Sequence, residues 1–96
     1  MHNEPSDIEF DLAKARENLR KHKVSFAQAE HALRDPLAST AEEIGLGNER
    51  RFTTLGADAN GRILIVIHTP RGDRTRLISA RKASKGESEK YHAQRI

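Results

Sequence analysis

The 96-residue sequence contains no cysteine and no tryptophan, and its longest uninterrupted apolar run is the five residues Ile63–Ile67. Without cysteine the chain has neither a disulfide framework nor a thiolate metal site, which favours a reducing compartment. A run of five apolar residues is far too short to cross a bilayer. Residues 1–5 also lack the charged-then-apolar pattern of a secretion signal. We therefore expect a soluble, cytoplasmic protein.

Apolar and aromatic residues are scarce as well. Hydrophobic residues make up 35% of the chain, charged residues 32% and aromatic residues only 4%. A chain of this length forms one domain with room for a single modest core. We therefore predict one domain over residues 1–96, with a thin core that leaves most side chains on the surface.

Positive charge is concentrated in one part of the sequence. The formal net charge is +3, but residues 1–49 carry −4, residues 50–82 carry +6 and residues 83–96 carry +1. Seven of the eight basic residues in the middle segment are arginine, the side chain best suited to bidentate contacts with phosphate. This pattern indicates a polyanionic partner, above all nucleic acid. A solvated basic surface on a half-exposed sheet would give the same composition.

The stretch from residue 62 to residue 81 predicts a hairpin at the centre of the fold. Four of the five residues in Ile63–Ile67 are β-branched, which is typical of a strand buried on both faces. Pro70-Arg71-Gly72 follows as a turn, with glycine in the left-handed position. The partner strand is Arg74–Ser79. Because side chains alternate along a strand, one of its faces should carry Arg74, Arg76 and Ile78.

The remaining elements follow from capping and turn signals. A helix capped by Asp11 runs from Leu12 to about His22, and a second one begins at the capping box Ser25–Gln28 and stops at Asp35-Pro36. Further predicted elements are a weak strand Leu37–Ile44, a strand Arg50–Leu55 and a last helix that begins within Ser79–Ser84. The order indicates an α+β fold with two N-terminal helices packed on a three- to four-stranded antiparallel sheet and a C-terminal helix.

Short motifs run through most of the chain in a fixed order. They are Ile8–Asp11, Ala13–Ala15, Asn18–His22, Val24–Phe26, Asp35-Pro36, Glu49-Arg50, Gly61-Arg62 and His68–Arg81, followed by Ala83, Glu87 and Tyr91. Together these motifs resemble the BrnT family, the toxin half of the BrnT–BrnA type II toxin–antitoxin systems. The most specific part is the arginine–glycine turn followed by Ile-Ser-Ala-Arg. Two positions depart from the family pattern: Lys23 stands where glycine is usual, and Phe10 where tryptophan is common.

The resemblance implies a fold similar to RelE-type ribonucleases and growth inhibition through RNA cleavage. It also implies neutralisation by a BrnA-type antitoxin, which supplies the DNA-binding part of a hetero-oligomeric complex that represses its own operon. Lys23 in place of glycine predicts that the first helix ends without a left-handed glycine cap. Phe10 in place of tryptophan reduces the aromatic area available for packing.

RNA cleavage without a metal needs a base for the ribose 2′-hydroxyl, cations for the phosphate and an acid for the leaving oxygen. Arginine stays charged at any working pH and suits the second task. Arg74 and Arg76 share a strand face, and Arg81 is expected at the start of the last helix, where free backbone N–H groups also attract anions. These three residues are the predicted phosphate site.

Three further residues are candidates for catalysis, each with a structural alternative. Glu49 is either a base or a salt-bridge partner that holds an arginine in place. His68, the only imidazole in the basic segment, is either an acid or base or a histidine at the edge of the core. Tyr91 stacks on a base, donates a proton, or only docks the last helix.

A second group is predicted to bind RNA without taking part in the chemistry: Arg50, Arg62, Arg71, Lys82 and His22. No metal or cofactor site is expected, because the five histidines are scattered through the chain. The alternative function is a non-catalytic module that grips RNA or serves only as the partner of an antitoxin. Direct DNA binding is a weaker hypothesis, since no helix has a convincing recognition face.

Overall fold

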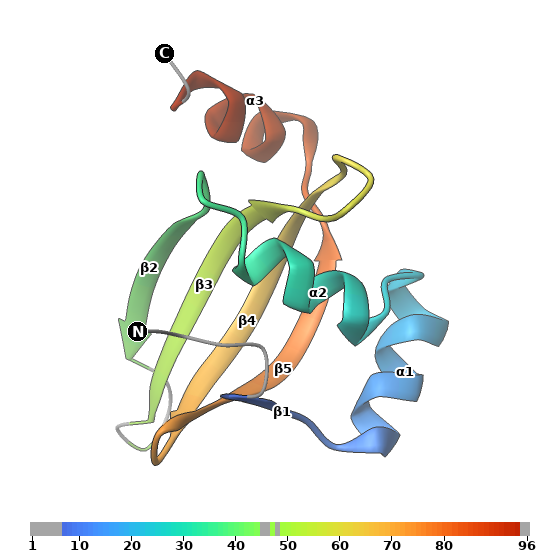
Figure 1. Ribbon diagram of the computed structural model, residues 1–96, viewed down its shortest axis with the longest axis vertical. Coiled ribbons are helices and arrows are strands. Elements are labelled where there is room, and N and C mark those ends of the chain that lie inside the picture. The colour runs from blue at the N-terminus through green and yellow to red at the C-terminus, as the bar shows by residue number, and fades with distance from the viewer. Residues whose placement is uncertain (1–6, 45–46, 48, 95–96) are drawn as a thin grey trace.

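The computed structural model describes residues 7–44, 47 and 49–94. Figure 1 shows a single sheet with two helices beside it and one helix at its end. In chain order the elements are β1 (Ile8–Glu9), α1 (Leu12–His22), α2 (Phe26–Leu33), β2 (Ser39–Ile44), β3 (Arg50–Ala57), β4 (Ile63–Arg71), β5 (Arg74–Lys82) and α3 (Lys85–Ala93). No helix in the described ranges has the length and hydropathy to cross a bilayer.

The sheet is mixed, with strand order β1-β5-β4-β3-β2. Strands β2 to β5 form an antiparallel meander, whereas β1 pairs with β5 in the parallel direction through Ile8–Thr75 and Glu9–Arg76. The prediction of a three- to four-stranded antiparallel sheet was therefore wrong in number and in direction. The sequence indicates a short extended start at Ile8–Phe10, but a strand of two residues is too short to show any alternation, so its pairing with β5 was not predicted.

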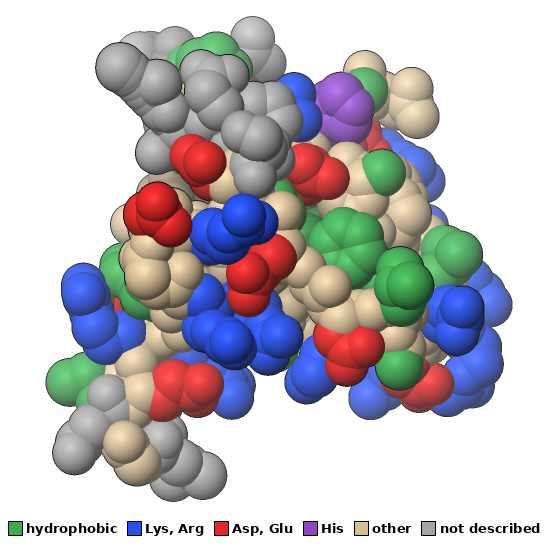
Figure 2. Space-filling model, turned by 60° about the horizontal axis from the view of Figure 1, so that its bottom comes forward, with side chains coloured by type: hydrophobic (Ala, Val, Ile, Leu, Met, Phe, Trp, Pro, Cys, Tyr) green, Lys and Arg blue, Asp and Glu red, His purple; other side chains and the backbone are tan. Residues whose placement is uncertain are grey.

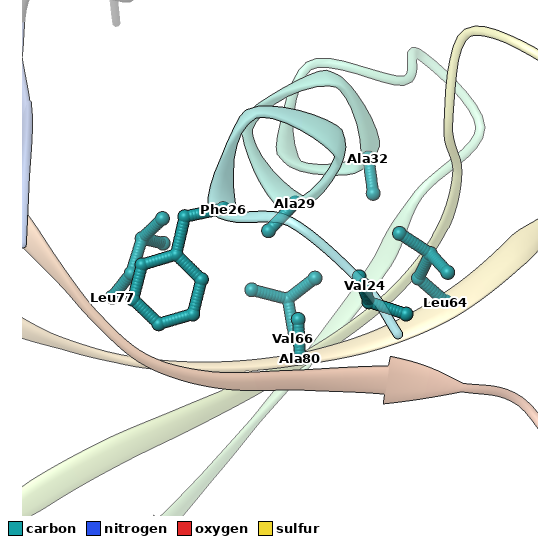
Figure 3. Close-up of a cluster of buried hydrophobic side chains, with 8 residues drawn as sticks. All are labelled: Val24, Phe26, Ala29, Ala32, Leu64, Val66, Leu77 and Ala80. Carbon is teal, nitrogen blue, oxygen red and sulfur yellow. The ribbon is translucent and has the colours of Figure 1, made fainter. Parts of the chain in front are cut away.

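The central strand β4 separates two hydrophobic clusters, as its unbroken apolar run predicts. Leu64 and Val66 point to the face covered by α2, and Ile63 and Ile65 point to the opposite face. The larger cluster lies between α2 and the sheet (Figure 3) and consists of Val24, Phe26, Ala29, Ala32, Leu64, Val66, Leu77 and Ala80. Small residues on α2 allow this helix to lie close above the strands.

The two N-terminal helices do not lie on the sheet as an equivalent pair. Helix α2 packs over β3, β4 and β5, whereas α1 packs against β5 at one side of the sheet (Figure 1). The buried Asn18 connects α1 to β5: its amide nitrogen donates to the Ala80 carbonyl at 2.8 Å, and its oxygen accepts from the Ala80 N–H at 3.0 Å. A side-chain amide thus satisfies both polar groups of a strand residue that β1 does not reach.

The ends of the first two helices follow their capping signals with one exception. The capping box of Ser25 and Gln28 is present, and Asp11 caps α1 through the Ala13 N–H at 3.0 Å. Helix α1 ends without a glycine cap, as expected, but it does not lose the left-handed conformation at its end. Lys23 itself adopts that conformation, with φ 61° and ψ 28°, and its N–H donates to the Leu19 carbonyl at 2.9 Å. A lysine thus fills a position that glycine would occupy with less strain.

Helix α3 closes one end of the sheet face opposite α2. Its buried Tyr91 forms a second cluster with Leu55, Ile63 and Ile65. The helix begins at Lys85 with a capping box, just after the predicted start within residues 79–84. Strand β5 ends at Lys82, three residues beyond its predicted end at Ser79. Leu77, Ser79 and Ala80 pair with β4, and this pairing outweighs the local helix signal.

Strands β4 and β5 contain two departures from regular alternation. The turn is shorter than predicted: Pro70 is still in β4, paired with Thr75, and Gly72 adopts φ 63° directly after Arg71. The second departure is a bulge in β5. His68 pairs with Leu77 and Ile67 with Ser79, which leaves Ile78 as the extra residue. The predicted common face of Arg74, Arg76 and Ile78 therefore ends at the bulge.

Candidate nucleic-acid interface

The bulge places four arginines on one face of the sheet. Partners in an antiparallel pair share a face, and the register pairs Arg71 with Arg74, Thr69 with Arg76, Ile67 with Ser79 and Ile65 with Arg81. Without the extra residue, five positions of alternation would put Arg76 and Arg81 on opposite faces. All four arginines therefore lie on the face that α2 does not cover.

This face has two parts with different surroundings. We call the part formed by Thr69, Arg71, Arg74 and Arg76 the hairpin end, because it lies at the turn between β4 and β5. We call the part formed by Leu55, Ile63, Ile65 and Arg81 the α3 end, because α3 packs over its apolar residues. Figure 2, in which the hairpin end is turned forward, shows Lys and Arg side chains gathered there with Asp and Glu side chains between them.

A hollow of about 400 Å³ lies at the hairpin end. Its lining brings together four of the residues predicted from the sequence: Glu49, Arg50, Arg71 and Arg76. The other residues of the lining are Lys14, Arg51, Thr69, Pro70, Leu77 and Ile78. Basic groups thus converge on the hollow from β3, β4, β5 and α1.

One carboxylate pairs with two arginines of the hairpin end. The Glu9 Oε2 atom lies 3.4 Å from the Nε of Arg76 and 4.0 Å from the Nε of Arg71. The Nε–H of Arg76 is buried and donates no hydrogen bond of good geometry to any described residue. Within the same ranges, Arg74 has no ion-pair partner. One loosely placed carboxylate leaves positive charge at this end for an incoming anion.

The start of β3 forms one wall of the hollow through alternating charges. Glu49 accepts a hydrogen bond from the Nε of Arg51 at 3.0 Å, which agrees with its predicted alternative as a salt-bridge partner. Arg50 donates to Glu42 at 2.7 Å, and its guanidinium carbon lies 5.2 Å from the ring centre of Phe52. The hydrogen bond from Arg50 lowers the pKa of Glu42. Arg50 is thus shared between the hollow and a neighbouring strand.

At the α3 end, Arg81 is engaged by one carboxylate, and its Nη1 also donates to the Lys82 carbonyl at 3.2 Å. Its two terminal nitrogens donate to the two oxygens of Glu87 at 2.9 and 3.0 Å. Glu87 also accepts from the Ser84 N–H at 2.8 Å as part of the helix cap. These hydrogen bonds, that from Arg81 first, lower the pKa of Glu87 from 4.5 to about 2, and the same pair raises the pKa of Arg81. Arg81 lies in β5 rather than at a helix start, which corrects the sequence expectation.

Tyr91 and His68 lie away from the hairpin end. The Tyr91 hydroxyl donates to the Asp35 carboxylate, which also accepts from the Ala57 N–H at 2.8 Å, so Tyr91 docks α3 on the rest of the fold. His68 lies on the α2 side of the sheet. Its Nε2 is 2.7 Å from the Thr54 hydroxyl, and burial lowers its pKa. These contacts fit the structural alternative given for each residue: Tyr91 docks the last helix, and His68 is a histidine at the edge of the core.

Three predicted RNA-binding residues also lie outside the hollow. Arg62 follows the turn after β3, and its Nε lies 3.2 Å from the buried carboxylate of Asp58. Burial raises the pKa of that carboxyl, but hydrogen bonds from Arg62, Gln28 and Asn60 outweigh it, so the net shift is downward. Lys82 is exposed and pairs with Leu64, which places it on the α2 side. His22 lies in the last turn of α1.

Sequence reasoning missed three residues of the hairpin end. Lys14 comes from α1 and Glu9 from β1, both far from the basic segment in sequence. Arg51 is in that segment, but alternation in a strand of unknown register could not place it. Lys14 and Glu9 belong to motifs of the family resemblance, which was the only available signal. Among the described residues, no group of three His, Cys, Asp or Glu side chains could hold a metal ion.

Comparisons with known proteins identify the family and the fold of the chain. Residues 10–87 match the family model described as ribonuclease toxin, BrnT, of type II toxin–antitoxin system. The fold is similar to the crystal structure of the Brucella abortus ribonuclease toxin, BrnT, with a TM-score of 0.60 and 28% sequence identity over 81% of this chain and 96% of that chain. No curated protein sequence matches the chain. The chain therefore belongs to the BrnT family of ribonuclease toxins of type II toxin–antitoxin systems.

Proposed function

We propose that residues 1–96 act as one domain, a metal-independent endoribonuclease toxin that binds the scissile phosphate at the hairpin end. One observation carries the proposal: Arg71, Arg74 and Arg76 share an open sheet face, and Glu9 is the only described carboxylate that pairs with any of them. Cations fixed in this way match the charge that develops on a phosphate during cleavage.

The reaction is attack of a ribose 2′-oxygen on the adjacent phosphorus, with loss of the 5′-oxygen of the next nucleotide. The 2′-hydroxyl gives up one proton and the leaving 5′-oxygen takes one up, so the step consumes no net proton. Arg74 and Arg76 stabilise the negative charge on the phosphate oxygens. Glu49 lines the same hollow as Arg76, beside Arg51, and is the candidate acceptor of the 2′-hydroxyl proton.

Cleavage of a single-stranded RNA by the purified protein, in EDTA and in Mg²⁺, tests this proposal. We expect equal rates in both, and a loss of at least about 100-fold for Arg76→Ala, the usual cost of removing one transition-state contact. Arg62→Ala is the matched control: it removes the same charge at a distant turn and should retain the parental rate. Cleavage that stops in EDTA would reject metal independence. RNA binding without cleavage would favour a non-catalytic module.

We further propose that the toxin acts in the cytoplasm and is neutralised by a BrnA-type antitoxin, with operator DNA bound only through that antitoxin. Membership of a toxin family whose type is defined by a protein antitoxin supports this proposal. Induction of the toxin alone should stop bacterial growth, and co-expression of a BrnA-type protein should restore growth and co-purify with the toxin. Growth arrest that persists beside a soluble BrnA-type protein would reject this choice of partner.

A further inference from the structure

A second hollow, of about 200 Å³, lies between α1 and β5. It shares Lys14 and Ile78 with the hollow at the hairpin end, so the two form one groove. Ile78 is the bulge residue of β5, in the stretch that neither β1 nor Asn18 pairs. We call this recess the edge groove; it is lined by Lys14, Glu17, Asn18, Lys21, His22, Ile78 and Ser79. Figure 1 shows α1 beside β5, where the groove lies.

One face of α1 supplies the charges of the edge groove. Lys14, Asn18 and Lys21 are four and seven residues apart, a spacing that puts them on one side of a helix. Asn18 is hydrogen-bonded to Ala80 of β5, so this side of α1 is turned toward the groove. At about 1.5 Å of rise per residue, the two lysines are separated by about 10 Å along the helix.

The edge groove has an excess of positive charge. Among the described residues, neither Lys14 nor Lys21 has an ion-pair partner. The one carboxylate of the groove, Glu17, is bound by Arg20 through hydrogen bonds of 3.2 and 2.5 Å, and this contact lowers its pKa. Its negative charge is therefore balanced mainly by Arg20 on the outer side of α1. Lys21 adds a smaller electrostatic attraction without forming an ion pair, so both lysines retain positive charge for an anion.

We propose that the edge groove is a second phosphate-binding subsite, which holds a single-stranded RNA chain beyond the scissile phosphate through Lys14 and Lys21. This inference rests on the proposed function, because the first phosphate is placed at Arg76. Phosphates of a flexible strand can follow both cations along the groove. Ile78, which lines the same groove, offers an apolar contact for an unstacked base, whereas a duplex keeps its bases stacked. The subsite thus selects single strands longer than two nucleotides.

Binding of non-cleavable 2′-O-methyl RNA to the full chain, followed by fluorescence anisotropy at several salt concentrations, tests the subsite. The variant is Lys14→Ala/Lys21→Ala. The matched control is Arg16→Ala/Lys23→Ala, which removes the same charge from the opposite side of α1. For an eight-nucleotide strand we expect the variant to bind more weakly and to lower the salt slope by about 1.4, or about 0.7 for each lost contact. The control should reduce the slope by less than half as much.

A two-nucleotide strand separates the subsite from the phosphate site at the hairpin end. The lysine variant should bind it as the parent does, whereas Arg76→Ala should weaken both lengths. Equal losses in the lysine variant and in its control would overturn the subsite, as would equal losses for both lengths. Cleavage assays separate the two proposals: a parent that binds RNA through the lysines but does not cut it contradicts the ribonuclease proposal alone. If the parent cuts RNA and the lysine variant has the same KM as the parent, only the subsite is contradicted.

Discussion

The two ends of the arginine-bearing sheet face use the same residue type in different ways. At the α3 end, Arg81 is held at both terminal nitrogens by Glu87, and α3 covers the apolar residues around it. At the hairpin end, Arg71 and Arg76 share one carboxylate at 4.0 and 3.4 Å beside an open hollow. One end thus uses charge to attach a helix, and the other leaves charge available to a ligand.

This difference shows why an arginine's partners matter more than its position in the sequence. Arg76 and Arg81 lie on one strand and, because of the bulge, on one face. A bidentate pair satisfies a guanidinium with directed hydrogen bonds. A carboxylate near two guanidiniums satisfies neither fully. We therefore propose the hairpin end as the phosphate site and a structural role for the contacts of the α3 end, while catalysis by Arg81 stays a prediction.

The largest expected effect comes from breaking the α3 end at Asp35. Asp35→Ala removes the acceptor for the Tyr91 hydroxyl and for the Ala57 and Leu37 N–H groups. Leaving these donors unsatisfied should lower the free energy of unfolding by about 3 kcal/mol. Urea denaturation measures the loss, with Asp11→Ala, which removes one exposed helix cap, as a smaller reference. The RNA cleavage rate per folded molecule should equal that of the parent. A lower rate in Asp35→Ala would show that the α3 end contributes to RNA cleavage.

A smaller effect is expected from Glu87, and it depends on pH. Folding lowers the pKa of Glu87 from 4.5 to about 2, so the folded state binds fewer protons than the unfolded state between these values. The stabilisation is complete above about pH 4.5 and is lost as the pH falls toward 2. Partial exposure of the pair limits it to about 1 kcal/mol.

Thermal melting of Glu87→Gln beside the parent measures this effect. The difference in Tm should be greatest near pH 6 and shrink as the pH is lowered to 3. A difference that does not change with pH would contradict the ion-pair origin. The same variant also addresses Arg81: if Arg81→Ala abolishes RNA cleavage while Glu87→Gln retains it, Arg81 contacts the substrate as well as α3.

The smallest expected effect sharpens the contrast at the hairpin end. Glu9→Gln removes the carboxylate that Arg71 and Arg76 share but retains the shape of the side chain. An RNA phosphate would then bind these arginines without displacing a negative charge, so affinity for single-stranded RNA should rise about two- to fivefold at low salt. Glu43→Gln, an exposed carboxylate on β2, is the control and should change affinity less. Weaker binding by Glu9→Gln would show that Glu9 positions the arginines rather than competing with RNA.

The sequence was sufficient for most elements of the fold. The apolar run of β4, the capping box at Ser25 and the turn at Gly72 are local signals, and each appears in the structure at or near the predicted place. Strand β1 and the bulge at Ile78 were not predictable. A two-residue strand has no period, and the bulge depends on the partner strand and on Asn18 of α1, which are distant in sequence.

The candidate site was predictable only in part for the same reason. Arg71, Arg74 and Arg76 could be placed on one hairpin because they are close in the chain. Lys14 reaches the hollow only because Asn18 attaches α1 to β5, a contact between residues 62 positions apart. Conversely, Tyr91 appears near the arginines in sequence, but its hydroxyl is engaged by Asp35 at the other end of the sheet.

Backbone amide chemical shifts, recorded by NMR while a non-cleavable eight-nucleotide RNA is added, test the assignment of the phosphate site most directly. We predict that the largest changes fall on residues 69–76 and on Ile78 and Ser79, at the hairpin end and the edge groove. Leu55, Ile63 and Tyr91 at the α3 end should shift little. Changes centred on residues 85–93, with residues 69–76 unaffected, would contradict the assignment and place the RNA beneath α3.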